Sequence, residues 1–305
     1  WRGSRDPYTI WLSEIILQQT RVVQGLPYFL RFKESFPRVE SLAAAEEEAV
    51  LKLWQGLGYY SRARNLHHTA RQVAFEMGGR FPDTYEGLLA LKGIGPYTAA
   101  AIASICFQAP TPVVDGNVYR VLARHFGIDL PVNTPAGQRY FREQSEKVMD
   151  PERPGDYNQA IMEFGALQCV PGKPDCGNCP LNPSCAAFAA NQVGDLPRKQ
   201  PKPRPRKRYF HYIMPVDPAF RTYLRQRDQR GIWQGLYEFP LLERKAPPDL
   251  PDLSEALALA TGSPPPEIIK KVRFNPRPIV HKLSHQHLHT TFWIVYVDAL
   301  PKASP

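Results

Sequence analysis

The spacing of apolar residues changes once along this chain, and that change limits the fold more than any other feature. Up to about residue 190, apolar residues recur about every 3.6 positions between Gly and Pro breaks, which predicts successive helices. From Tyr209 onward, short runs rich in β-branched and aromatic residues predict strands. At 305 residues the chain also exceeds the usual size of one core. We therefore expect a multidomain protein, with an all-α domain over 1–190 and a smaller α+β domain over 209–305.

Local patterns place the expected elements. Helices are predicted in the first domain at 9–23, 46–54, 61–77, 84–91, 97–107 and 117–126. Strands are predicted in the second domain at HYIMPV, TYLRQR, LYEFPL, KKVRFN and TTFWIVYV, with one helix at 253–260.

A basic, proline-rich segment lies between the two domains. The run PRKQPKPRPRKR begins at Pro197 and contains no acidic residue. Alternating prolines favour an extended connector, so we expect a solvated linker over 191–208. Its charge can also help to hold a phosphate backbone.

The net charge and hydropathy narrow the class of protein. A charge of +9 suits a polyanionic partner, although many basic proteins never bind nucleic acid. No stretch approaches the roughly 18 apolar residues of a membrane span. The sequence begins at Trp1 without an initiator Met, so we expect a few preceding residues, and no targeting segment is visible. We expect a monomer in the cytoplasm, associated with the nucleoid of a bacterium.

Four of the five cysteines form the pattern C-x6-C-x2-C-x5-C. Crowded thiolates hold either one tetrahedral metal or an iron–sulfur cubane, whereas zinc sites usually combine two close pairs and this pattern has one. Ordinary buried thiols are the remaining alternative. The spacing resembles that of the endonuclease III superfamily of DNA glycosylases. That resemblance implies a 4Fe-4S cluster held by Cys169, Cys176, Cys179 and Cys185, and it leaves Cys106 as a core thiol.

A glycine turn precedes the helix predicted at 97–107. Gly93 and Gly95 permit positive φ and close backbone approach, so amide groups at the helix start can bind an anion. Most turns of this kind are only connections. This one resembles the helix-hairpin-helix motif of the same superfamily, which implies contact with a DNA phosphate. Bifunctional members carry a lysine where this chain has Tyr97, and a tyrosine cannot form a Schiff base. We therefore expect no lyase activity.

Two carboxylates are candidates for bond cleavage. Hydrolysis of a glycosidic bond uses a neutral carboxylic acid and a second carboxylate that stays ionised. Glu14 shares a mostly apolar helix face, where burial favours its neutral form, or else it points to water at the edge of that face. Asp115 precedes a predicted helix as a natural N-cap, and the amide donors there keep it ionised.

Several motifs resemble the MutY family of adenine DNA glycosylases. They are WLSEIILQQTRV, LWQGLGYYSRARNLH, GIGPYT and VVDGNVYRVLAR, together with the four cysteines. The resemblance implies base excision repair of double-stranded DNA, with removal of adenine mispaired with 8-oxoguanine or guanine. It also implies that Glu14 protonates adenine N7 and later assists water, that Asp115 stabilises the cationic sugar and that Tyr97 supports the site.

The same resemblance assigns contacts with DNA. It places four residues around the extruded adenine: Trp1, Arg2, Leu17 and Gln159. It places Gln19 and Tyr59 inside the duplex beside the mispair, where a planar group can replace lost stacking.

The second domain resembles the Nudix-like C-terminal domain of that family through QRGIWQGLYEFP. The helix-borne glutamates of a pyrophosphatase are absent, so nucleotide hydrolysis is disfavoured. The family reads oxidised guanine through a Phe-Ser-His loop, which matches Leu283, Ser284 and His285, with Leu283 in place of the aromatic residue. For the histidines from His281 to His289, a partly exposed strand is preferred to a second metal site.

Two other functions remain open from sequence. One is an endonuclease III-type glycosylase/lyase, which Tyr97 and the second domain oppose. The other is a non-catalytic iron–sulfur DNA-binding protein, which would need neither Glu14 nor Asp115. Release of free adenine from a duplex would distinguish among the three.

Overall fold

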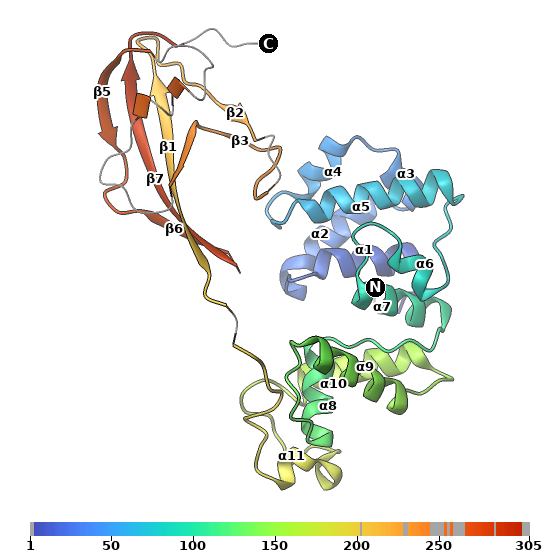
Figure 1. Ribbon diagram of the computed structural model, residues 1–305. Coiled ribbons are helices and arrows are strands. Elements are labelled where there is room, and N and C mark those ends of the chain that lie inside the picture. The colour runs from blue at the N-terminus through green and yellow to red at the C-terminus, as the bar shows by residue number, and fades with distance from the viewer. Residues whose placement is uncertain are drawn as a thin grey trace. The chain divides into compact units, whose positions relative to one another are not determined.

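The computed structural model describes residues 3–201, 203–227, 231–244, 253–254, 257–258, 266–283 and 285–300. The chain divides into two compact units, Trp1–Gln200 and Pro201–Pro305. The first is helical and the second is built on a sheet (Figure 1). Within the described residues, no helix has the length and apolar character needed to cross a membrane.

Short helices make up the first unit. They are α1 (Pro7–Leu17), α2 (Val22–Ser35), α3 (Val39–Ala43), α4 (Glu47–Trp54), α5 (Ser61–Arg71), α6 (Tyr85–Leu89), α7 (Pro96–Phe107), α8 (Gly116–Phe126), α9 (Pro135–Val148), α10 (Pro154–Leu167) and α11 (Ala186–Ala189). A π-helical turn, η1 (Gln72–Glu76), continues α5, and a 3-10 turn, η2 (Asn182–Ser184), precedes α11. The side chains of Asp6, Thr84, Asp115 and Thr134 cap helix N-termini, as such residues commonly do.

Two apolar cores lie inside this unit. Helices α1 to α7 bury the first core around Trp11, Phe32 and Trp54, whereas α8, α9 and α11 surround a second core that contains Phe141. Helix α10 packs against both α7 and α8 and so joins the two cores. Small residues allow this close packing: a Cβ at Gly155 would lie 2.8 Å from the carbonyl oxygen of Ser104 on α7.

The helix predicted at 9–23 is wrong at its C-terminal end. Helix α1 ends at Leu17 and α2 begins at Val22, with Gln19 between them at φ 56°. A left-handed residue cannot continue a right-handed helix. Val22 and Val23, which extended the apolar pattern, are 46% and 88% exposed and do not belong to the core. The other five predicted segments each contain a helix, and α2, α3, α9, α10 and α11 were not predicted individually.

The second unit contains β1 (Arg206–Val216), β2 (Arg225–Gln226), β3 (Tyr237–Glu238), β4 (Leu241–Arg244), β5 (Ile268–Arg273), β6 (Ile279–Lys282) and β7 (Gln286–Val297). The main sheet has the order β4-β1-β7-β5, with β6 also paired to β7. Strands β1 and β7 are parallel, from Arg206 beside Gln286 to Val216 beside Tyr296, and the other pairs are antiparallel. Leu253 and Leu257, in helical conformation, bury against the sheet. The rest of the helix predicted at 253–260 lies largely outside the described residues.

The structure differs at both ends from the solvated linker expected over 191–208. Leu196 is buried, and the carbonyl oxygen of Arg198 accepts a hydrogen bond from the amide of Val132 at 3.0 Å. The amide of Gln200 donates to the Asn133 side chain at 2.7 Å. Strand β1 already begins at Arg206. The segment is therefore bonded to the first unit up to Gln200 and joins the sheet from Arg206, although most of its residues are exposed as expected.

Candidate active site

Three polar side chains from three helices form the candidate site. Glu14 lies on α1, Tyr97 in the first turn of α7, and Asp115 at the N-cap of α8. Helices α1 and α7 pack together (Figure 1). The charge of Asp115 and a hydrogen bond from Tyr97 both act on the Glu14 carboxyl, so the three groups are neighbours.

Glu14 is the perturbed acid of this group. Burial, the largest effect, and the nearby Asp115 carboxylate raise its pKa from 4.5 to about 7, against the lowering effect of the hydrogen bond from Tyr97. Desolvation disfavours the charged form of a carboxyl group, which is the cause expected for a side chain on an apolar helix face. About half of the Glu14 side chains therefore carry a proton at neutral pH.

Tyr97 is held as a neutral phenol beside this acid. Burial, followed by the charges of Glu14 and Asp115, raises the pKa of Tyr97 well above its usual range. Its hydroxyl also lies 3.7 Å from the sulfur of Met162 on α10. The residue is a hydrogen-bond donor at all physiological pH values and offers no amine.

Asp115 is anchored by the helix that it caps. Its Oδ1 accepts hydrogen bonds from the backbone amides of Asn117 and Val118, each at 2.8 Å. Its Oδ2 accepts from the side-chain amide of Asn117 at 2.9 Å. The carboxylate is therefore fixed in direction, with the positive end of α8 behind it.

Asn158 positions the segment before Asp115, a role that was not predicted from the sequence. It is fully buried on α10, where its Oδ1 accepts from the amide of Val113 at 3.0 Å. Its Nδ2 donates to the carbonyl of Thr111 and to the hydroxyl of Ser104, both at 2.9 Å. The only local sign of this role was an amide side chain three positions after Gly155. It could not be used, because the helix that carries it was not predicted.

The glycine turn leaves the start of α7 open. Gly93 has φ +82°, and a Cβ there would lie 2.7 Å from Cβ of Asn65, so this position requires glycine. Gly95 differs from the expectation, because its φ of −91° is available to any residue. A Cβ at Gly95 would meet nothing within 4 Å, and no side chain caps the helix. The amides of α7 are therefore accessible to an anion.

The residues expected to contact DNA have different surroundings. Gln19 and Tyr59 are exposed in two separate turns, and both have positive φ, 56° and 49°. Leu17 lies against Gly25 of α2, and Gln159 is half-buried on α10 next to Asn158. Trp1 and Arg2 lie outside the described residues.

The four clustered cysteines lie between the end of α10 and the start of α11. All are free thiols, and Arg124 donates to Sγ of Cys169 at 3.4 Å. Burial and then the charges of Cys169, Cys185 and Cys179 raise the pKa of Cys176, which shows that the four thiols are neighbours. In the part of the chain that the structure describes, no three His, Cys, Asp or Glu side chains converge as they would on one ion.

The four thiols, with the Arg124 guanidinium that donates to Sγ of Cys169, provide the thiolate donors and the hydrogen bond to sulfur that an iron–sulfur site would use. Cys106 is different: it is half-buried among apolar residues, and burial raises its pKa to about 12.

In the second unit, the predicted recognition loop is only partly described. Leu283 packs partly against the cluster of Phe210, Tyr212 and Leu288, and its amide donates to the carbonyl of Gln286 at 2.8 Å. His285 is exposed, and Ser284 lies outside the described residues. The neighbouring histidines belong to β6 and β7, as the preferred strand interpretation predicted.

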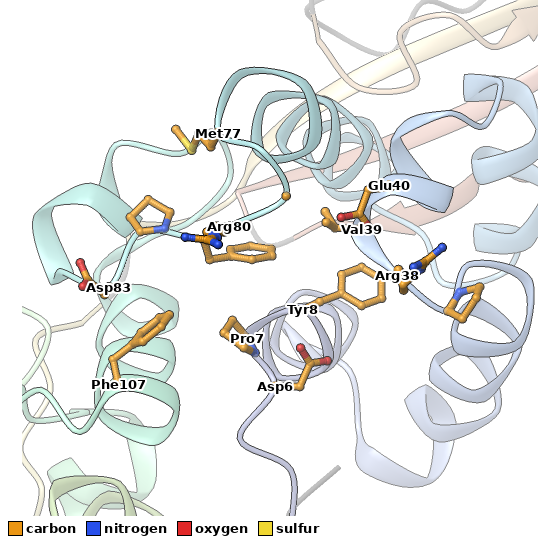
Figure 2. A pocket seen from close by; sticks show the side chains of 14 residues that line it. Asp6, Pro7, Tyr8, Arg38, Val39, Glu40, Met77, Arg80, Asp83 and Phe107 are labelled. Carbon is orange, nitrogen blue, oxygen red and sulfur yellow. The ribbon is translucent and has the colours of Figure 1, made fainter.

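A cleft of about 790 Å³ opens elsewhere in the first unit and contains none of the three site residues. Figure 2 shows Asp6 and Tyr8 on one side of it and Arg80 and Asp83 on the other. The side chain of Asp6 already caps α1, where it accepts a hydrogen bond from the amide of Thr9 at 3.0 Å. The cleft therefore adds nothing to the acid–base group.

Comparisons with known proteins identify the class of this protein. Residues 12–145 match the family model of HhH-GPD superfamily base excision DNA repair proteins, and residues 211–304 match that of the NUDIX domain. The solved structure of a thermostable thymine-DNA glycosylase is 30% identical, with a TM-score of 0.57 over 62% of this chain and 88% of that chain. The fold and these matches thus define the class: a base excision DNA repair protein of the HhH-GPD superfamily.

Curated relatives narrow this class. The adenine DNA glycosylase of Buchnera aphidicola subsp. Baizongia pistaciae is 34% identical over 249 residues, which are 80% of this chain and 69% of that protein. The chain belongs to the adenine DNA glycosylase family, as the sequence motifs predicted. The adenine DNA glycosylase of Mus musculus is 37% identical over an alignment of 281 residues, and the match covers 78% of this chain. This chain spans 55% of the length of the mouse relative and 44% of that from Arabidopsis thaliana.

Proposed function

We propose that this chain removes adenine from double-stranded DNA by hydrolysing its N-glycosidic bond, and that it acts on adenine opposite 8-oxoguanine or guanine. The observation that carries this proposal is the pairing of two unlike carboxyl groups. Glu14 has a pKa of about 7, and Asp115 accepts three hydrogen bonds that orient it. Such pairs divide acid and stabilising roles between them.

Departure of adenine needs a proton on the base. Glu14 in its neutral form donates that proton to N7 as the bond to the sugar breaks. Positive charge then develops on the sugar, and the fixed carboxylate of Asp115 stabilises it. The ionised Glu14 next takes a proton from the attacking water, which returns the acid to its starting state. Tyr97 keeps Glu14 in place through its hydrogen bond.

The reaction is monofunctional. Strand cleavage through a Schiff base requires an amine that can attack the sugar, and Tyr97 supplies a phenol in the position that the family resemblance assigns to lysine. The high pKa of this phenol also disfavours its use as a nucleophile.

Binding of the duplex uses the features that lie around the acid–base group. The uncapped start of α7 binds a phosphate through its amides. The exposed side chains of Gln19 and Tyr59 enter the duplex as adenine leaves the stack. Leu17 and Gln159, with Trp1 and Arg2, line the pocket for the extruded base.

The four free thiols after α10 would hold a 4Fe-4S cluster. When bound, it supplies a structural tie for a loop that has little apolar core of its own. Arg124 and Arg120 attach that loop to α8, because they donate to Cys169 and to its carbonyl oxygen. The loop is thereby linked to the helix that Asp115 caps.

Recognition of the oxidised guanine belongs to the second unit. The loop of Leu283, Ser284 and His285 approaches the base opposite adenine, and Ser284 offers a hydrogen bond to the lesion. The protein acts as a monomer on DNA in the bacterial cytoplasm.

Single-turnover release of free adenine tests the proposal. Three duplexes are compared, with adenine opposite 8-oxoguanine, guanine or thymine. We expect release from the first two and little from the third. Glu14→Gln should bind the mispair but release almost no adenine, whereas Glu34→Gln, an exposed acid on α2, should behave as the unaltered protein. Undiminished release by Glu14→Gln rejects the assignment of the acid, and no release by the unaltered protein rejects the function.

A further inference from the structure

Two turns of the first unit hold bulky residues in left-handed conformation. Gln19 lies between α1 and α2, and Tyr59 lies between α4 and α5. This conformation is disfavoured for residues with a side chain, and it persists only where the surroundings impose it. Tyr59 is 56% exposed, so burial of its own ring does not explain the geometry. Something else must hold both turns.

Arg62 contacts both turns from the first turn of α5. Its Nη1 donates to the carbonyl oxygen of Gln18 at 2.6 Å and lies 3.2 Å from that of Ile16. Its Nη2 lies 3.4 Å from the carbonyl oxygen of Gly58. One guanidinium therefore bonds to the backbone immediately before Gln19 and immediately before Tyr59.

Two aromatic rings contact the guanidinium of Arg62. Its carbon lies 5.1 Å from the ring centroid of Trp54 and 5.7 Å from that of Tyr59. Trp54 is fully buried, and its Nε1 donates to the carbonyl oxygen of Gly58 at 2.9 Å. Burial lowers the pKa of Arg62 from its usual value, although an arginine remains charged. The cation is held mainly by carbonyl dipoles and ring faces.

We propose that Arg62 is a positioning residue that locks the Gln19 turn and the Tyr59 turn into one rigid wedge. The inference rests on the proposed function, which gives this wedge the task of holding the duplex open beside the extruded adenine. A planar fork is suited to that task because its donors diverge toward two separate backbone segments. A lysine ammonium is a point charge and cannot bond to both turns in the same way.

Base extrusion, measured apart from chemistry, tests the wedge. The probe is a duplex with 2-aminopurine at the adenine position opposite 8-oxoguanine, whose fluorescence rises when the base leaves the stack. Binding is followed in parallel by the anisotropy of a dye at the duplex end. We expect Arg62→Lys to bind within about threefold of the unaltered chain but to extrude the probe at least about tenfold less. The matched control is Arg64→Lys on the same helix, whose side chain pairs with Glu47 at 3.6 Å, and it should change neither quantity.

A double-mutant cycle excludes a merely structural role. If Arg62 acts through the wedge, Arg62→Lys should reduce extrusion little further once Tyr59→Ala has removed the ring. Equal loss of binding and extrusion in Arg62→Lys, full extrusion by that variant, or full additivity with Tyr59→Ala would each overturn the inference, as would absence of extrusion by the unaltered chain. Extrusion without release of adenine by the unaltered chain would instead reject the proposed function and leave the wedge supported.

Discussion

Tyr97→Phe should move the pH dependence of adenine release in a defined direction. The hydrogen bond from Tyr97 lowers the pKa of Glu14, so its removal should raise that pKa above its value of about 7. The proton donor is the neutral form of Glu14, which is present below the pKa and lost above it. The alkaline limb of the rate profile should therefore move to higher pH.

The magnitude follows from the fraction of neutral Glu14. With an ordinary pKa of 4.5, about 0.3% of the side chains would carry the proton at pH 7, whereas with a pKa of about 7 about half of them do. The combined effect of burial, Tyr97 and Asp115 thus increases the neutral form at pH 7 by roughly 150-fold. A hydrogen bond to a charged group is worth about 1.5 kcal/mol or more, so its loss should shift the limb by roughly one pH unit.

The assay is single-turnover adenine release between about pH 6 and pH 9 at saturating enzyme, so that binding does not limit the rate. Tyr157→Phe on α10 is the matched control. Tyr157 is also a phenol whose pKa is raised by burial, but it is not among the groups that shift the pKa of Glu14. The alkaline limb of the rate profile of Tyr157→Phe should coincide with that of the unaltered protein. A limb of Tyr97→Phe that moves to lower pH, or no alkaline limb in either protein, would refute the assignment of Glu14 as the acid.

Four further outcomes are expected. Above pH 7, Glu14→Gln should be more stable than the unaltered protein, by at most about 3 kcal/mol in denaturant unfolding. The pKa of Glu14 is higher in the folded than in the unfolded state, so the unaltered protein loses stability as pH rises from 4.5 to about 7. An equal stability difference between the two proteins at pH 5 and pH 8 would contradict this. The purified protein should be brown with about four irons per chain, and Cys176→Ser should lose iron; stoichiometric zinc without iron would refute the cluster. Product DNA should stay unbroken until heated, and efficient borohydride trapping would contradict the role of Tyr97. Removal of 201–305 should reduce discrimination between 8-oxoguanine and guanine more than cleavage itself, with a milder effect for Ser284→Ala; equal losses on both duplexes would make the second unit a general clamp.

Local patterns were enough to predict the two kinds of domain and most helices around the site. Asp115 was recognised as a cap because an aspartate before an apolar helix has few other local roles. The family followed from motifs near Glu14 and the cysteines. The break between α1 and α2 was missed because Val22 and Val23 continued the apolar spacing although both are exposed.

Roles that depend on distant segments were not visible in the sequence. Asn158 bonds to residues more than 40 positions earlier in the chain, and Arg62 bonds to Gln18, 44 positions away. The parallel pairing of β1 with β7 joins strands from opposite ends of the second unit. Hydrogen bonds to backbone carbonyls leave no pattern in the sequence, because every residue has such a carbonyl.

Helix α8 carries Asp115 at its N-terminus and, further along, the two arginines that bond to the cysteine loop. Arg120 and Arg124 lie five and nine positions after Asp115 and both bond to Cys169. Each residue of a helix turns the chain by about 100°, so one inserted or deleted residue between Asp115 and Arg120 would swing both arginines away from the loop. Side chains on the outer face of α8 can be exchanged without moving the two arginines, whereas a change in the length of this interval would break both contacts. Insertions and deletions among related genes should therefore accumulate in the connecting loops and spare the interval from Asp115 to Arg124.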